Sequence, residues 1–166
     1  MNTNIRRATM ADLAAIITIY NQTIPTRLAT ADTQAVSVES RLDWFVAHHE
    51  RRPLLVVEID NTIAGWVSLN DFYGRPAYHS TVELSIYVDD NFQGKGLGHQ
   101  MITHCIKLAP ALNITHLLGF VFSHNHASIR LLKTHGFKQW GQLPEIAEMD
   151  QNRYSLDIWG LKVTND

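Results

Sequence analysis

One stretch constrains the fold more than any other part of the chain, because a strand pattern runs into a glycine-rich turn and then into a helix. Hydrophobic and polar side chains alternate from Ser80 to Val88, as in a half-buried strand. Residues 93–98 read Gln-Gly-Lys-Gly-Leu-Gly, and apolar residues at helical spacing then continue through Leu108. The chain must therefore combine a sheet with helices that pack against it.

The rest of the chain repeats this alternation of helices and strands. Thr9 is expected to cap a first helix, Ser37 a second, and Asn125 a short helix that Gly136 ends. The strands are expected at 54–59, 62–69, 80–88, 116–122, 138–143 and 154–163, with a turn at 60–61. This order predicts an α+β fold in three layers: a mixed, mostly antiparallel central sheet with helices on both faces, in one domain over residues 1–166.

Composition limits the possible partners. Fourteen Lys and Arg residues against 16 Asp and Glu residues give a net charge of -2, so no overall field favours nucleic acid. No stretch approaches the roughly 18 apolar residues of a membrane span, and the first residues are too polar for a secretory signal. We therefore expect a cytoplasmic protein that binds neither nucleic acid nor membrane.

The single cysteine and the nine histidines do not form a recognisable reactive or metal site. Cys105 lies among apolar residues, which favours a packed helix position over a nucleophile. His48 and His49 are adjacent, and His124 and His126 flank the capping Asn125, so their spacing does not suit a metal site. We expect no metal.

The glycine turn favours an anion as ligand. Glycines permit positive φ and close backbone approach, so that successive N–H groups point at phosphate oxygens at the positive end of the following helix. Lys95 would add a charge. An ordinary tight turn would use the same glycines, and this alternative stays open. A Walker-type loop is excluded because Gly96, and not Ser or Thr, follows Lys95.

Two motifs resemble those of the GNAT superfamily of N-acetyltransferases. Gln93-x-x-Gly96-x-Gly98 after a Val/Ile-rich strand is similar to its acetyl-CoA signature, and Asn125-x-x-Ser128-x-x-Leu131 followed by Gly136-Phe137 is similar to its next helix. The resemblance implies an acetyl-CoA-dependent enzyme, often a homodimer, in which Asn125 bonds near the pantetheine. The cofactor-binding residues it implies are Ile86, Tyr87, Val88, Gln93, Gly94, Lys95, Gly96, Leu97, Gly98, His99 and Asn125. Trp140, Trp159 and Phe72 are candidates for either a dimer contact or the core.

Three further segments resemble the phosphinothricin N-acetyltransferases and their relatives: Ile19-Tyr20-Asn21, Arg75-Pro76-Ala77-Tyr78, and Glu83 just before Ile86-Tyr87-Val88. This resemblance implies a small, amino-acid-like primary amine as substrate. Arg75, with Tyr73 and Tyr78, is expected to hold its carboxylate or phosphinate, although an exposed loop arginine fits the residues equally well. Acetylation of a protein or peptide amino terminus, or a non-enzymatic acyl-CoA sensor, are the alternatives.

Acetyl transfer to an amine requires a base, because an ammonium must lose a proton before its nitrogen attacks the thioester. Glu83 is the candidate, acting through water as the family implies, while the backbone near 86–88 stabilises the oxyanion. The competing interpretation is an ordinary glutamate on a polar strand face. Leu132 stands where many relatives place a tyrosine acid. Tyr154 stands where phosphinothricin-type enzymes often carry a histidine, so the resemblance makes Tyr154 the candidate acid. A thiol with a pKa near ~8.5 also leaves unaided as thiolate.

Overall fold

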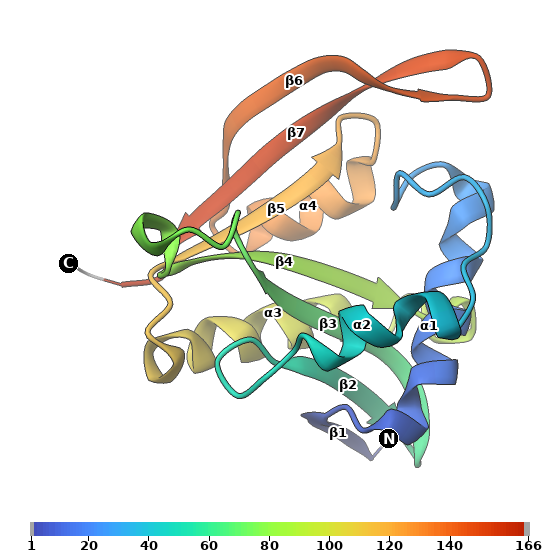
Figure 1. Ribbon diagram of the computed structural model, residues 1–166, viewed down its shortest axis with the longest axis vertical. Coiled ribbons are helices and arrows are strands. Elements are labelled where there is room, and N and C mark those ends of the chain that lie inside the picture. The colour runs from blue at the N-terminus through green and yellow to red at the C-terminus, as the bar shows by residue number, and fades with distance from the viewer. Residues whose placement is uncertain (1, 165–166) are drawn as a thin grey trace.

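The computed structural model describes residues 2–164. Within them, seven strands form one sheet in the order β1-β2-β3-β4-β5-β7-β6, and each neighbouring pair is antiparallel except β4 with β5 (Figure 1). The strands are β1 (Thr3–Arg7), β2 (Leu54–Ile59), β3 (Thr62–Asp71), β4 (Thr81–Val88), β5 (His116–Phe122), β6 (Lys138–Met149) and β7 (Asn152–Lys162). The predicted mixed, mostly antiparallel sheet is confirmed. The predicted domain over 1–166 includes residues 1, 165 and 166, which lie outside the described part, and it stays a prediction.

Helices lie on both faces of this sheet, as predicted. The α-helices are α1 (Leu13–Thr23), α2 (Leu42–Val46), α3 (Leu97–Leu108) and α4 (His126–Thr134), and the short 3-10 turns are η1 (Met10–Asp12), η2 (Ile24–Thr26), η3 (Glu39–Arg41), η4 (Pro76–Tyr78), η5 (Asp90–Phe92) and η6 (Ala109–Leu112). Figure 1 shows α3 and α1 on opposite sides of β3 and β4.

Strand alternation divides the buried side chains between two cores. Leu55 and Val57 of β2 join the larger core with Met101 of α3, whereas Leu54 and Val56 join the smaller core with residues of α1. Successive side chains of a strand point to opposite faces, so one run of apolar residues packs against both layers. This explains why β2 is hydrophobic almost throughout.

The predicted hairpin at residues 54–69 forms with a two-residue turn. Asp60 and Asn61 both have positive φ, 49° and 66°, the conformation that type I′ hairpin turns require and that Asn and Asp tolerate. β2 and β3 pair on either side of the turn, from Ile59 with Thr62 outward. The local sequence therefore determines this part of the sheet.

Two parts of the sheet differ from the sequence prediction. The pattern does not predict β1, because Thr3–Arg7 is mostly polar; the strand forms because it pairs with β2 and because Arg6 bonds to Glu58 and Asp12. β6 continues to Met149, beyond the predicted 138–143, and β7 begins at Asn152 and ends at Lys162, against the predicted 154–163. The register between β6 and β7 shifts between Leu143 and Ala147, around Pro144. Pairing with β7 then resumes at Ala147, beyond the residues that the alternating sequence pattern predicts as a strand.

Helix starts lie close to their predicted positions. The backbone N–H of Thr9 donates to the Asp12 carboxylate (2.7 Å), and the Ser37 hydroxyl accepts the N–H of Ser40 (3.1 Å). The Asn125 side chain accepts the N–H of Ser128 at the start of α4 (3.2 Å). These bonds satisfy N–H groups that a helix leaves unpaired.

Candidate active site

The two central strands part in the middle of the sheet. β4 and β5 pair only from Thr81 to Glu83 with His116 to Leu118. Beyond that point β4 continues to Val88 paired with β3 alone, while β5 continues paired with β7 (Figure 1). The residues of β4 after Glu83 therefore present backbone polar groups that no β5 partner satisfies, and such groups are open to a ligand.

The glycine turn has the geometry that anion binding needs. Gly94 and Gly96 have φ values of 76° and 75°, and a Cβ built at either position meets no atom within 4 Å. Within the described residues, no side chain caps α3, which begins at Leu97. The N–H groups of its first turn therefore remain available at the positive end of the helix dipole.

Gly98 has a different reason to be glycine. It lies inside α3, and a Cβ at this position would come within 2.9 Å of Leu131 Cδ2 on α4. The missing side chain lets the two helices approach closely. Of the three glycines in the motif, two allow a backbone conformation and the third allows helix packing.

A first cavity, the cofactor cavity, opens at this turn with a volume of about 460 Å³. Side chains and backbone of β4, the turn and α4 line it. The predicted cofactor residues that line it are Ile86, Tyr87, Val88, Gln93, Gly94, Gly96, Leu97, Gly98 and His99. Lys95 does not line it, and the Gln93 side chain donates to the Val88 carbonyl (3.0 Å).

A second cavity of about 80 Å³ follows the gap between β4 and β5. It shares Ala29, Ile86, Tyr87, Ser128 and Leu131 with the cofactor cavity, so the two are adjacent. Asn125 lines it and is buried; its amide donates to the Leu28 carbonyl (3.1 Å). Leu132 also lines it and brings no hydroxyl group.

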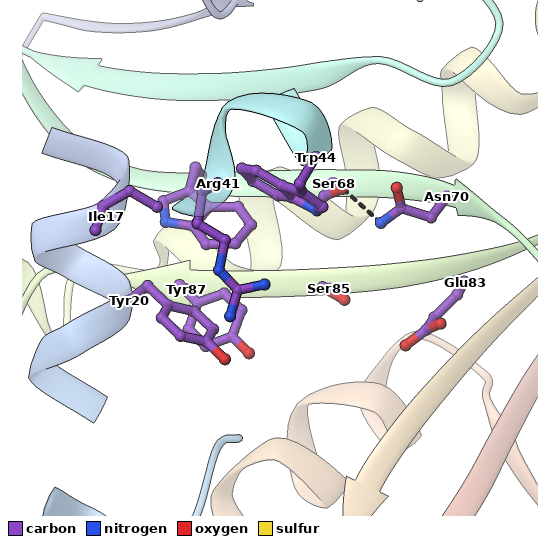
Figure 2. Close-up of a pocket in the computed structure, with 10 residues that line it drawn as sticks. Ile17, Tyr20, Arg41, Trp44, Ser68, Asn70, Glu83, Ser85 and Tyr87 are labelled. Carbon is purple, nitrogen blue, oxygen red and sulfur yellow. Dashed lines mark hydrogen bonds between the residues drawn. The ribbon is translucent and has the colours of Figure 1, made fainter. Parts of the chain in front are cut away.

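A third cavity, the acceptor cavity, lies between the sheet and the segment formed by α1, η3 and α2 (Figure 2). Its volume is about 220 Å³, and it shares Ser85 and Tyr87 with the second cavity. Its lining residues are Ile17, Tyr20, Arg41, Trp44, Trp66, Ser68, Asn70, Glu83, Ser85 and Tyr87. The three cavities therefore lie next to one another between the glycine turn and Glu83.

Glu83 is half-buried in this cavity, and burial raises the pKa of its carboxyl group. No side chain or backbone group among residues 2–164 donates a hydrogen bond to the carboxylate of Glu83. A carboxylate without a cationic partner in a partly buried site takes up a proton more readily than one in water. The carboxylate of Glu83 is therefore more basic than that of a solvent-exposed glutamate.

Aromatic rings form one wall of the acceptor cavity. The Tyr87 ring stacks on Trp66, with ring centroids 4.6 Å apart, and lies 5.2 Å from the Tyr20 ring. Burial raises the pKa of Tyr87, and burial together with the Asp32 carboxylate raises that of Tyr20. Both phenols stay protonated at neutral pH, so neither supplies a base.

Arg41 is a lining residue that the sequence pattern does not single out. Its Nη2 donates to Asp32 (2.7 Å), which also accepts the Tyr20 hydroxyl, and its guanidinium lies 5.4 Å from the Tyr20 ring centroid. The one sequence feature that bears on Arg41 is the Ser37 cap, which predicts where the helical segment of η3 and α2 begins. The cap does not predict which side chains of that segment face the sheet.

The predicted substrate residues lie elsewhere. Three exposed side chains lie just before or within η4: Tyr73, Arg75 and Tyr78. The centroids of the two tyrosine rings are 6.3 Å apart. None of the three residues lines the acceptor cavity. Tyr154 lines none of the three cavities, and its ring lies 4.5 Å from that of His124. Their roles stay predictions.

Cys105 and the histidines behave as core or surface residues. Cys105 is fully buried, and burial raises its pKa to about 12. The part of the chain that the structure describes contains no group of three or more His, Cys, Asp or Glu residues that could hold a metal ion. Among those same residues, no helix is both long and apolar enough to cross a bilayer.

Known proteins share both the sequence and the fold. Residues 14–137 match the acetyltransferase (GNAT) family. The chain is 47% identical over 161 residues to YwnH of Bacillus subtilis (strain 168), a phosphinothricin acetyltransferase-like protein, covering 96% of this chain and 99% of the relative. It is 33% identical over 150 residues to the L-methionine sulfoximine/L-methionine sulfone acetyltransferase of Pseudomonas paraeruginosa (strain DSM 24068 / PA7), covering 89% and 87%.

A solved structure extends the likeness to the whole fold. The acetyltransferase-like yncA from Salmonella typhimurium, with its cofactor acetyl-CoA, superposes with a TM-score of 0.92 at 31% identity over 100% of this chain and 96% of that one. These matches confirm the resemblance that the two sequence motifs indicated. The chain therefore belongs to the GNAT acetyltransferase family, the acetyl-CoA-dependent N-acetyltransferases.

Proposed function

We propose that the enzyme acetylates the primary amine of a small, amino-acid-like substrate of the phosphinothricin or methionine sulfoximine type, with Glu83 as general base. The observation that carries this proposal is that Ser85 and Tyr87 line both the acceptor cavity and the second cavity, which itself borders the cofactor cavity. Glu83 lines the acceptor cavity, and no Lys, Arg or His among residues 2–164 forms a salt bridge with it. The activities that the names of the relatives state support the same substrate class.

The path of cavities suggests how acetyl-CoA would lie. The pyrophosphate would bind at Gly94 and Gly96, the pantetheine would follow the gap between β4 and β5 past Asn125, and the thioester would reach Ser85. Backbone N–H groups near Ile86 would then face the carbonyl oxygen, because β5 does not pair with β4 there. Donors placed where charge develops are the usual stabilisers of an acyl-transfer intermediate.

The reaction would proceed by direct attack. Glu83, through a water molecule, takes a proton from the ammonium, and the free amine nitrogen attacks the thioester carbonyl. A C–N bond forms, the C–S bond breaks, CoA leaves as a thiolate, and the nitrogen gives up its second proton to that thiolate or to solvent. A thiolate with a parent pKa near ~8.5 leaves without full protonation, which is consistent with the apolar Leu132 in the second cavity.

The size of the acceptor cavity favours a small amine over a peptide. Its volume of about 220 Å³ falls below the roughly 300–1,000 Å³ of pockets that enclose drug-sized ligands. A protein or peptide amino terminus would also need a groove for the following residues. Family membership argues against a non-enzymatic sensor, because the chain belongs to a family of acetyltransferases.

We also propose a cytoplasmic homodimer without nucleic-acid or membrane partners. The edge strand β6 exposes Trp140, Leu143 and Ile146, which supports an apolar contact between copies. Trp159 is instead buried in the core, and Phe72 is half-buried. Sedimentation equilibrium of the wild type and of Trp140→Lys tests this: a monomeric wild type would contradict the dimer.

Glu83→Gln tests the catalytic proposal, because it keeps size and removes basicity. We expect turnover of L-methionine sulfone at pH 7 to fall by about 10²-fold or more, with acetyl-CoA affinity unchanged. The wild-type kcat/KM should rise with pH through an apparent pKa above the usual Glu value of about 4.3, since burial raises the pKa of Glu83. The variant should recover partly at high pH, where solution supplies free amine. An unchanged rate and profile would show that another group takes the proton.

A further inference from the structure

A chain of hydrogen bonds runs from the segment after α2 into the acceptor cavity. Nδ1 of His48 lies 2.9 Å from the Trp44 carbonyl oxygen, and Nε2 lies 2.6 Å from the Ser68 hydroxyl. The Asn70 amide donates from Nδ2 to the same hydroxyl (2.8 Å), the bond that Figure 2 marks with a dashed line. Ser68 is fully buried, and both Ser68 and Asn70 line the cavity. His48, Ser68 and Asn70 therefore form one relay.

Each donor in this relay can be assigned. A carbonyl oxygen only accepts hydrogen bonds, so Nδ1 of His48 carries a proton and, in the neutral ring, Nε2 accepts. The Ser68 hydroxyl then donates to Nε2, and its oxygen accepts from the Asn70 amide. Only the nitrogen of an amide donates, so the relay holds the nitrogen of Asn70, and not its oxygen, against Ser68.

Asn70 lies beside the candidate base Glu83. The two residues are register partners on β3 and β4, and such partners have Cβ atoms about 4.5–5.5 Å apart on one face of the sheet. The amide nitrogen has two N–H groups. One of them bonds to Ser68, and among residues 2–164 no group accepts from the other. One N–H donor therefore remains for a water molecule or a ligand next to Glu83.

We propose that Asn70 positions the water molecule through which Glu83 takes the proton of the substrate, and that His48 keeps the Asn70 amide in the orientation this requires. The inference rests on the proposed function and adds positioning residues to it. The N–H of Asn70 donates to one lone pair of the water, and the other lone pair takes a proton from the ammonium. A hydrogen of the water passes to the Glu83 carboxylate.

This transfer is balanced. One N–H bond of the ammonium breaks, one O–H bond forms on Glu83, and the water molecule is regenerated. An amide oxygen in place of the nitrogen would instead accept a hydrogen of the water and compete with Glu83 for it. The orientation of the Asn70 amide therefore affects the rate of proton transfer.

Protonation of His48 reverses the relay. With a proton on Nε2 as well, the ring donates to the Ser68 hydroxyl, and that hydroxyl is left to donate to Asn70. The amide then has to turn its oxygen toward Ser68, which places an acceptor where the donor was. We therefore expect proton transfer to need a neutral His48.

Burial favours the neutral ring. It lowers the pKa of His48, and the neighbouring His49 lowers it further, while bonds to backbone carbonyls of α2 oppose part of this shift. Other charged groups lie on both sides of the relay. Arg7 of β1 lines a neighbouring pocket with the two histidines, and Arg41 and Glu83 line the acceptor cavity with Ser68.

Nitrogen NMR of protein with nitrogen-15-labelled histidine tests the relay without an activity assay. At pH 8 we expect a neutral His48 ring with its proton on Nδ1, and a pKa below the usual value of about 6.5, since burial lowers it. The signals are assigned by their loss in His48→Gln. A ring with its proton on Nε2 at pH 8 would overturn the assigned direction of the relay, and the inference with it.

The kinetic test measures kcat for L-methionine sulfone against pH in wild type, Asn70→Ala, Ser68→Ala, His48→Gln and the exposed neighbour control His49→Gln. In Asn70→Ala and Ser68→Ala we expect kcat at pH 8 to fall about 10-fold, the loss of one oriented hydrogen bond, with the KM for acetyl-CoA unchanged. Melting temperatures show that the variants are folded.

His48→Gln separates positioning from packing, because its amide oxygen still accepts from Ser68 and its side chain does not titrate. It should have nearly the wild-type kcat at pH 8. As pH falls through the His48 pKa found by NMR, it should become up to about 10-fold faster than wild type. His49→Gln should follow wild type at every pH.

The outcomes separate this inference from the proposed function. A constant ratio of His48→Gln to wild type through that pKa overturns the role of His48. An unchanged kcat in folded Asn70→Ala overturns the positioning of the water by Asn70. Both results leave the proposed function standing. If the wild type acetylates no amine of this class at any pH, the proposed function fails, and the inference fails with it.

Discussion

Replacing Gly96 with valine should remove acetyl-CoA binding at a small cost in stability. The residue has a φ of 75°, a conformation that costs an ordinary L-residue about 1–2 kcal/mol, with a β-branched residue at the upper end. A Cβ there meets no protein atom within 4 Å, so no steric clash adds to this figure. For a chain of this size the melting temperature should fall by about 2–8 °C.

The expected loss of affinity is larger. The added side chain would project from the turn where we expect the pyrophosphate. Charge-assisted hydrogen bonds contribute about 1.5–3 kcal/mol each, so losing two of them weakens binding by about 10²- to 10⁴-fold. Calorimetric titration with acetyl-CoA measures this loss. Acetyl-pantetheine, which lacks the pyrophosphate, should bind wild type and variant with the same weak affinity.

Gly74→Val is the matched control. Gly74 has a φ of 64°, a Cβ there meets no atom within 4 Å, and it lines none of the three cavities, so the same backbone strain of about 1–2 kcal/mol applies. The two variants should therefore lose similar stability, whereas only Gly96→Val loses most of its affinity for acetyl-CoA. Unchanged affinity in Gly96→Val, or an equal loss for acetyl-pantetheine, would refute the pyrophosphate reasoning.

Three further outcomes follow from the structure. Tyr154→Phe should leave kcat/KM nearly unchanged, since Tyr154 lines none of the three cavities; a loss as large as that of Glu83→Gln would make it the acid. Cys105, whose pKa burial raises to about 12, should react with a thiol reagent at pH 8 only after unfolding, and rapid labelling of the native protein would contradict its buried position. The bonds from Arg6 lower the pKa of Asp12, so its stabilisation is present above the unfolded pKa of about 3.9 and is lost as pH falls through the lower folded pKa. Asp12→Asn should lower the free energy of unfolding by about 1–3 kcal/mol at pH 7. The urea midpoint of the variant should also change less with pH in that acidic range, and a midpoint equal to that of the wild type would exclude a stabilising role of Asp12.

The glycine turn and the segments on either side of it could be predicted from the sequence because they are close in the chain. The strand that ends at Val88, the turn with Gly94 and Gly96, and the helix from Leu97 are consecutive segments. Positive φ at those two glycines and the Asn125 cap are local requirements, and only a few residue types meet them. Short-range pattern therefore determined the fold class, the turn geometry and the family.

The acceptor half depends on segments that only the sheet brings together. Tyr20, Arg41, Ser68 and Glu83 come from α1, η3, β3 and β4. The family resemblance pointed to Glu83 and to the segment around Tyr20, but Arg41 and Ser68 are not distinctive within their own segments. Arg75 carries the stronger local signal, yet it lies outside the cavity, whereas Arg41 lies inside because Asp32 and Tyr20 hold it there.

The polar strand β1 and the extension of β6 past Pro144 also depend on segments that only the sheet brings together. Backbone pairing with a neighbouring strand stabilises them, and their own side chains show little apolar alternation. Local propensity and periodicity act over a few residues, so the sequence by itself determined the elements and the cofactor turn. Which side chains share a cavity depends on how α1 and α2 pack over the sheet, and only the tertiary structure decided that.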